Sequence, residues 1–367
     1  EPIDTILIRD KLVEKNLSDT ITDNYLLGLQ DHALIPSHSQ HYQQLVIEAF
    51  NRRREISILE KALKDTYKGD CVVEDVISNL TLQAIQKNEN VPMHELGDRF
   101  LQDCIDGKVG NFDWWCEEWT RKLGKMTSEL MILHAPRSTG KTALMLQWIT
   151  NAHKLKYRTP LASIEMLKPE LLPRFIAHIG QVNTYFMRTR GFPTQNEIGK
   201  SREAINDIKL LEFSVRDKGM SIDDIRGWAI AEAKAGVDAI FIDNLLSIND
   251  GGKRYESKTL MYDYFIRRLR DLRDELKIPI ILLAHPNQDG LVAWSRDVEN
   301  FADIIVYMEN IHEAIMVNGK TIPQRDYNGD HVIARFQKNR QGESPVASLE
   351  FCKNYQTFIH RQWEDVS

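Results

Sequence analysis

A strand pattern, a short loop and a helix pattern follow one another without a break near the middle of this chain. The apolar run Leu130–His134 leads into a loop whose residues are Ala135, Pro136, Arg137, Ser138, Thr139, Gly140, Lys141 and Thr142. A helical pattern begins at Thr142 and continues to Leu155. A loop that ends Gly-Lys-Thr between a strand and a helix is typical of a phosphate-binding loop, although Ala135 replaces the usual first glycine.

The chemistry of this loop explains why those residue types are needed. Backbone N–H groups and the positive end of the helix dipole attract phosphates. Lys141 is expected to reach the β- and γ-phosphate oxygens, and the Thr142 hydroxyl can bind Mg²⁺. The sequence therefore predicts a P-loop ATPase with ATP and Mg²⁺ as its cofactors.

Alternating patterns extend this unit into an α/β domain from residue 91 to residue 367. The predicted strands are Leu130–His134, Pro160–Ile164, Lys209–Val215, Asp238–Ile242, Ile278–Ala284, Ile304–Met308, Val332–Phe336 and Val346–Phe351. Helical patterns fill most of the gaps, including Thr142–Leu155, Ser221–Ala235 and Ser257–Leu276. Such alternation predicts a mostly parallel sheet covered by helices. The later, more closely spaced strands predict antiparallel additions at one edge.

The chain before residue 91 has a different pattern. Residues 1–70 contain amphipathic helical stripes, which predict a small all-α N-terminal domain. Residues 71–90 contain one further amphipathic helix, Val73–Gln86, between two polar breaks, as expected of a linker element. The chain opens Glu-Pro-Ile-Asp without an initiating Met, which suggests that its natural N-terminus lies upstream.

Composition limits the classes of protein to which the chain can belong. A length of 367 residues, with 42% apolar and 27% charged residues, suits a globular protein of about two domains. No apolar run approaches the roughly 20 residues of a membrane span, so a cytoplasmic protein without membrane contact is expected. The net charge of −6 argues against general nucleic-acid coating but allows a local basic channel. Four widely spaced cysteines make a zinc site improbable.

Two carboxylates follow strands of the predicted sheet. Asp243 ends the apolar run Asp238–Ile242 about 100 residues after the P-loop, where a Walker-B aspartate would hold Mg²⁺. Glu165 follows the strand Pro160–Ile164. Because the carboxyl ends of parallel strands gather at the ligand crevice, Glu165 is expected to act as the general base on the attacking water.

Two further segments suit catalytic roles less specifically. His285 ends the strand Ile278–Ala284 and could sense the γ-phosphate, although a lone histidine at a strand end is more often a structural residue. Lys338 and Arg340 lie in a basic turn after the strand Val332–Phe336. Such a turn can insert an arginine into a neighbouring subunit, but by residue type alone a solvated hairpin tip is the simpler interpretation.

Nucleic-acid contacts are less well defined by the sequence. Lys253 and Arg254 lie in the glycine-rich loop after Asp243, and Arg296 lies in the loop after His285. Loops at these two positions could face a central channel and bind phosphates. Trp114, Trp115 and Trp119 are expected to pack against the motor core.

Taken together, these segments resemble the DnaB-type replicative helicases of bacteria and phages. The matching segments are Ala135–Thr142, Ser163–Met166, Ile242–Leu246 and Lys338–Gly342. The resemblance extends upstream to the N-terminal domain and linker helix and is strongest from Leu130 to Phe351. It implies a RecA-like core and a homo-hexamer that translocates on single-stranded DNA. It also implies that Lys338 and Arg340 act on ATP held by the adjacent subunit. A primase and a helicase loader are the implied partners.

This sequence also departs from the family pattern. His285 replaces the usual Gln and resembles the His of phage primase-helicases, while Asn244 replaces an aromatic residue. These departures suggest a divergent member encoded by a phage or prophage in a bacterial cell. Two alternatives stay open: a RecA-like recombinase or clock-type ATPase without unwinding activity, and a non-hydrolytic nucleotide-locked assembly factor.

Overall fold

The computed structural model describes residues 93–106, 110–189, 194–211, 214–286 and 300–365, with five further residues between Arg52 and Glu60. The chain divides into two compact units, Glu1–Arg99 and Phe100–Ser367. Most of the predicted N-terminal domain and the whole of the linker helix Val73–Gln86 lie outside the described residues. No helix within the described ranges is long and apolar enough to cross a membrane.

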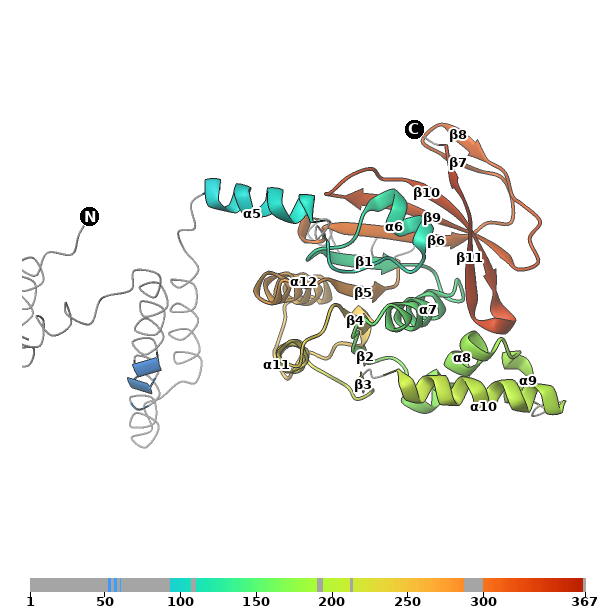
Figure 1. Ribbon diagram of the computed structural model, residues 1–367, viewed down its shortest axis with the longest axis horizontal. Coiled ribbons are helices and arrows are strands. Elements are labelled where there is room, and N and C mark those ends of the chain that lie inside the picture. Colours follow the sequence, from blue (N-terminus) through green and yellow to red (C-terminus); the bar gives the residue numbers. More distant parts are fainter. Residues whose placement is uncertain are drawn as a thin grey trace, which may run out of the picture. The chain divides into compact units, whose positions relative to one another are not determined.

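A nine-stranded sheet forms the centre of the second unit (Figure 1). Its order is β11-β10-β9-β6-β1-β5-β4-β2-β3. The strands are β1 (Leu130–His134), β2 (Leu161–Ser163), β3 (Val215–Arg216), β4 (Ile240–Asp243), β5 (Ile280–Ala284), β6 (Ile304–Asn310), β9 (Asp330–Asn339), β10 (Val346–Cys352) and β11 (Thr357–Glu364). The pairs from β3 through β6 are parallel, and β9, β10 and β11 are antiparallel additions at one edge. The predicted α/β architecture is thus confirmed.

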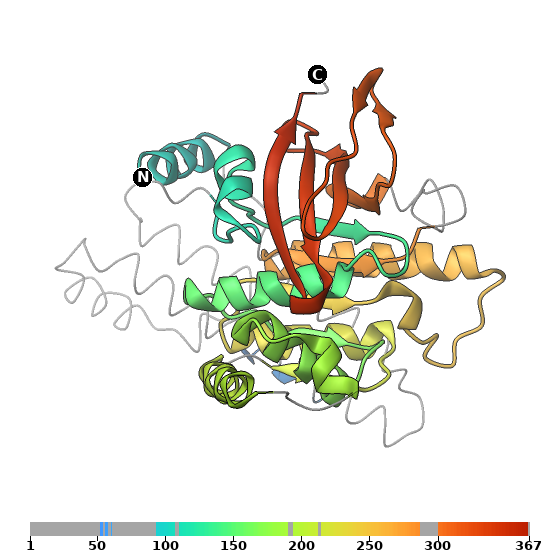
Figure 2. The ribbon, with the colours of Figure 1, turned by 90° about the vertical axis from the view of Figure 1, so that its right-hand side faces the viewer.

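Each central strand buries both of its faces, because helices cover the sheet on either side. Met131 and Leu133 of β1 face the cluster that contains Trp148 of α7 (Lys141–Lys154). Leu130 and Ile132 face the opposite cluster, which is formed with α11 (Ile222–Lys234) and α12 (Lys258–Leu276). This alternation is the period of two that a strand imposes on its side chains. Figure 2 shows the antiparallel strands extending beyond the helical layers.

The predicted tryptophan packing is confirmed. Trp114, Trp115 and Trp119 are between 1% and 5% exposed and belong to the same core cluster as Trp148. Trp119 is on α6 (Glu117–Leu123), and its ring lies 5.2 Å from Phe336 of β9 and 5.4 Å from Trp363 of β11. The segment before β1 therefore fastens the antiparallel strands to the motor core.

One predicted strand is wrong. Lys209 and Leu210 close α10 (Gln195–Leu210), and only Val215–Arg216 forms a strand nearby. The Thr194 hydroxyl caps this helix by accepting the Glu197 N–H at 3.3 Å. The helix therefore includes Lys209 and Leu210, the first two residues that the strand prediction had assigned to the sheet, and Leu211 is its C-cap.

The sequence prediction gave no bounds for several elements. They are α5 (Met93–Ile105), α6, α8 (Lys168–Gly180), α9 (Thr184–Thr189), α10, the hairpin β7 (Ile315–Val317) and β8 (Lys320–Ile322), and β11. The helix α5 exposes Met93, Phe100, Leu101 and Ile105. The three predicted helices correspond to α7, α11 and α12 within one residue at each end.

Two buried histidines make the stability of this unit sensitive to acid. Burial lowers the pKa of both His134 and His178 to about 4. A histidine with a lowered folded pKa stabilises the native state above its unfolded pKa of about 6.5, and this contribution is lost as the pH falls from there towards 4. Each histidine should therefore lower the free energy of unfolding by about 2 kcal/mol at pH 5 relative to pH 7.5.

Replacing His178 with Gln tests this contribution. Gln can still hydrogen-bond to the Thr357 hydroxyl, which lies 3.0 Å from His178 Nδ1, but it does not titrate. The drop in Tm between pH 7.5 and pH 5 should shrink by about 4–8 °C relative to the unsubstituted chain. An equal drop in both proteins would contradict the assigned cause.

Candidate nucleotide-binding site

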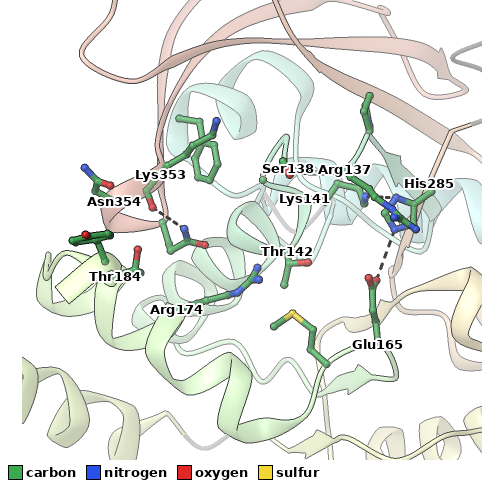
Figure 3. Close-up of a pocket in the computed structure, with 16 residues that line it drawn as sticks. Arg137, Ser138, Lys141, Thr142, Glu165, Arg174, Thr184, His285, Lys353 and Asn354 are labelled. Atoms are coloured by element: carbon green, nitrogen blue, oxygen red, sulfur yellow. Dashed lines mark hydrogen bonds and ion pairs between the residues drawn. The ribbon is translucent and has the colours of Figure 1, made fainter. Parts of the chain in front are cut away.

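A cavity of about 620 Å³ opens where β1, β2 and β5 end. Its lining comprises Pro136, Arg137, Ser138, Gly140, Lys141, Thr142, Glu165, Met166, Arg174, Thr184, Tyr185, His285, Phe351, Lys353, Asn354 and Gln356. Figure 3 shows Lys141, His285 and Glu165 on one side of this space, with Lys353 and Asn354 on the other. The structure thus brings the P-loop, Glu165 and His285 together, as the sequence predicted.

Gly140 is required by both its backbone and its surroundings. Its φ of +100° lies in the left-handed region that side chains rarely adopt. A Cβ here would also lie 2.7 Å from Phe351 and 2.8 Å from Phe358, whose stacked rings have centroids 4.4 Å apart. The aromatic pair therefore supports the P-loop from beneath and excludes every residue except glycine.

Lys141 is the buried cation of the cavity. Its Nζ donates to the Ala135 carbonyl at 3.0 Å and lies 3.0 Å from His285 Nδ1. Burial lowers the pKa of Lys141 to about 8, while the charges of Asp243 and Glu165 act in the opposite direction. An incoming phosphate would replace these weak partners and stabilise the charged form of the lysine.

Asp243 ends β4 beside the first turn of α7. The Thr142 hydroxyl donates to Asp243 Oδ2 at 3.0 Å, whereas Asp243 Oδ1 is buried and has no hydrogen-bond partner among the described residues. Burial, followed by the negative charge of Glu165, raises the pKa of Asp243 to about 6. A buried carboxylate oxygen without a donor is the kind of group that a bound cation would satisfy.

Glu165 follows β2, and its carboxylate lies beside Asn244 and His285. Asn244 Nδ2 donates a short hydrogen bond to Glu165 Oε2, and His285 Nε2 lies 3.8 Å from the same oxygen. The His285 imidazole, despite partial burial of the carboxyl, lowers the pKa of Glu165. The carboxylate is therefore ionised near neutral pH, which is the state that a general base requires.

Arg340 lies at the other end of the sheet from the P-loop of its own chain. In the sheet register His134, which precedes the P-loop, is opposite Tyr307, whereas Asn339 is opposite Ile304, at the start of β6. Tyr307 and Ile304 are three residues apart on β6, which is roughly 10 Å along the strand. Arg340 therefore lies away from its own cavity, and Lys338, which pairs with Ile305, lies one step nearer.

A bulge shapes the strand that leads to this turn. Lys338 is opposite Ile305 while Phe336 is opposite Val306, so Gln337 is the extra residue of β9. Its Oε1 lies 2.7 Å from Nε2 of the buried His134. The bulge thus ties the strand that carries Lys338 and Arg340 to the base of the P-loop.

The predicted DNA-contact residues have separate outcomes. Lys253 is occupied within the chain, since its Nζ lies 2.8 Å from Asp223 and 5.5 Å from the Tyr264 ring centroid. Arg254 is exposed in the same loop. Arg296 lies outside the described residues. None of these three DNA contacts is tested by the positions of the residues, and all three stay predictions.

Two features of the site could not be found by sequence reasoning. Asn244 was identified only as a departure from a family pattern, not as a partner of Glu165, which is 79 positions away in the chain. Phe351 and the residues around Lys353 reach the cavity because β10 and β11 meet beside α7, and no local motif marks them.

Comparison with known proteins decides the family. A profile of the DnaB-like helicase C terminal domain matches residues 120–360. The chain belongs to this family. It is therefore an ATP-hydrolysing DNA helicase, and the recombinase, clock-type and non-hydrolytic alternatives are not favoured.

Relatives and solved structures agree with this assignment. The replicative DNA helicase DnaC of Bacillus subtilis (strain 168) is 24% identical over 404 aligned positions, covering 100% of this chain and 85% of that protein. The replicative DNA helicase DnaB of Geobacillus stearothermophilus is also 24% identical, covering 98% of this chain and 83% of that protein.

Two solved structures share the fold of this DnaB-like chain. One is an isolated ATPase domain with a TM-score of 0.63 and 23% identity, with 75% of this chain and 100% of that one covered. The other is a DnaB-like replicative helicase studied for its interactions with primase, with a TM-score of 0.62, 22% identity and coverage of 97% and 87%. The predicted RecA-like core is thus confirmed.

Proposed function

We propose that this DnaB-like chain works in a hexameric ring whose ATP sites lie between subunits. One subunit would supply the P-loop, Glu165 and Asp243, and its neighbour would supply Lys338 and Arg340. Hydrolysis would move the loops that follow Asp243 and His285 along single-stranded DNA in the channel and separate the duplex, with Lys253, Arg254 and Arg296 as candidate phosphate contacts.

The position of Arg340 carries this proposal. The buried cation Lys141 and the carboxylate of Glu165 line the cavity, and Asp243 is bonded to Thr142 at its edge. The basic turn of the same chain lies instead at the opposite end of the sheet. A head-to-tail ring joins two different surfaces of neighbouring subunits, and in the proposed ring it would bring that end of one subunit to the cavity of the next. An arginine supplied in this way is typically worth about 10³–10⁵ in rate.

Mg²⁺ is the metal that fits the P-loop end of the cavity. Thr142 and Asp243 would hold it, because both offer oxygen ligands and the buried Oδ1 of Asp243 lacks a donor. When bound, the ion would neutralise charge that develops on the β- and γ-phosphates.

The side chains of the chain itself divide the remaining work. Lys141 would bind the β- and γ-phosphate oxygens, and Glu165 would take a proton from the attacking water. Asn244 and His285 would hold Glu165 in place through the contacts described above. His285 would also register the γ-phosphate, because its Nδ1 lies beside Lys141.

ATPase rate against protein concentration, with and without single-stranded DNA, tests the shared site. The rate per subunit should rise steeply with concentration as rings assemble, and single-stranded DNA should raise it further. A forked duplex should be unwound only under conditions that give rings. If the rate per subunit is the same at all protein concentrations, the sites do not depend on ring assembly. If single-stranded DNA leaves the rate unchanged, ATP hydrolysis is not coupled to DNA binding.

Further partners follow from the family and stay proposals. A primase and a helicase loader are the expected partners in the bacterial cytoplasm, where replication takes place. Phage or prophage origin stays a prediction from His285 and Asn244.

A further inference from the structure

The guanidinium of Arg340 is bound by its own subunit. Nη1 donates to Asp303 Oδ1 at 3.1 Å, and Nη2 donates to the Asn300 carbonyl at 2.7 Å. The Arg340 N–H also donates to the Asp303 carbonyl at 3.0 Å. Each terminal nitrogen therefore gives one of its two N–H groups to an acceptor of its own subunit, and these contacts fix the direction of the guanidinium. The side chain is still 48% exposed, so a neighbouring ligand can reach it.

Asp303 has a second cationic partner, which binds its other carboxylate oxygen and is independent of Arg340. Its Oδ2 accepts from Arg273 Nη1 at 2.8 Å and from the Leu130 N–H at 2.9 Å. The Asp303 side chain is only 8% exposed, so leaving it without a counter-charge would be costly. Because Arg273 stays in place, Arg340 can leave Oδ1 without stranding a buried charge.

A second carboxylate holds the same turn without touching Arg340. Glu129, which is 1% exposed, accepts from the Gln341 side chain and from the Thr127 N–H. The turn is therefore anchored at Gln341 independently of Asp303, and release of the Arg340 guanidinium does not require the turn to detach.

We propose that Asp303 is a positioning residue that withholds Arg340 from the neighbouring site until ATP is bound there. The inference rests on the role of Arg340 proposed above. The γ-phosphate of the neighbour's ATP offers several charged oxygens and competes with one carboxylate oxygen for the guanidinium. Because part of the binding free energy must displace Asp303, the contact lowers the apparent affinity of the shared site for ATP.

Asp303→Asn tests the withholding contact. Two donors, Arg273 and the Leu130 N–H, demand an acceptor at the Oδ2 position, so the amide oxygen should occupy it. The Asn NH₂ group then faces Arg340 and cannot accept its hydrogen bond. The KM for ATP should fall about two- to fivefold, the span of a partly exposed ion pair, while kcat at saturating ATP stays the same.

Arg273→Gln should change the KM for ATP in the opposite direction. It is a separate variant, so its result does not depend on whether Asp303→Asn folds. Without Arg273, the Asp303 carboxylate has Arg340 as its main counter-charge and should hold it more tightly. The KM for ATP should then rise, again with little change in kcat. Thermal melting establishes that each variant is folded at the assay temperature.

Glu129→Gln is the matched control, because it is the same chemical change at the same turn without contact with Arg340. It should leave the KM for ATP unchanged. In an Arg340→Ala background, Asp303→Asn should have no effect on KM. An effect of equal size in that background, or in Glu129→Gln, would assign the change to a loosened turn and overturn the proposal.

The two proposals fail in different ways. A normal ATPase rate for Arg340→Ala would remove Arg340 from the reaction, and both proposals would fall. A low rate for Arg340→Ala, together with an unchanged or raised KM in Asp303→Asn, would keep the shared site and overturn only the withholding role.

Discussion

Replacing Glu165 with Gln should lower ATP turnover by about 10²–10⁴-fold, the usual contribution of a positioned general base. Gln has the same length as Glu, and its amide oxygen can still accept the hydrogen bond from Asn244. It cannot take a proton from water. Binding of ATP should be nearly unchanged, since Lys141 and Thr142 are untouched.

Turnover and equilibrium binding of a fluorescent ATP analogue measure the two effects separately. Glu170→Gln is a suitable control, because Glu170 lies five positions further on, is exposed, and caps α8 by accepting the Leu167 N–H. Gln can keep that cap, so turnover should be normal. Unchanged turnover in the Glu165 variant would remove this carboxylate from the mechanism.

Arg340→Ala should lower ATP turnover by about 10³-fold or more while leaving the subunit folded. Asp303 stays paired with Arg273 in this variant, so the substitution strands no buried charge. Lys141→Ala should also be inactive, for the different reason that phosphate binding is lost. Neither variant alone can form a complete site.

Mixed rings of these two variants should recover activity. In a random equal mixture half of the sites have an intact Lys141, and half of those face a neighbour with Arg340, so about a quarter of sites are complete in a head-to-tail ring. Turnover of the mixture should approach that fraction of the normal rate. In a control mixture, Arg340→Ala subunits are combined with subunits that carry both Lys141→Ala and Arg340→Ala. This mixture should recover no activity, because no subunit in it has Arg340.

Native mass spectrometry can establish that subunits mix. If mixed rings form and the rate stays at the level of the separate variants, the sites are not shared between subunits.

The parts of this protein that could be predicted from the sequence are those encoded in short stretches of chain. Leu130–His134, the P-loop and the helix after it are adjacent, so strand propensity, glycine and the helix start are all local signals. Asp243 and Glu165 were found for a related reason, because each ends or follows a strand and parallel strands end at the same edge. The prediction for Lys209–Val215 failed because apolar residues at a helix end resemble a short strand.

Contacts between distant parts of the chain were decided only by the tertiary structure. Asn244 meets Glu165 because β4 lies beside β2, and Phe351 supports Gly140 because the antiparallel strands reach α7. Asp303 meets Arg340 because β6 pairs with β9. The P-loop needs only neighbouring residues to bind phosphate, whereas the placement of Arg340 away from its own cavity depends on strand order and register, which long-range packing sets.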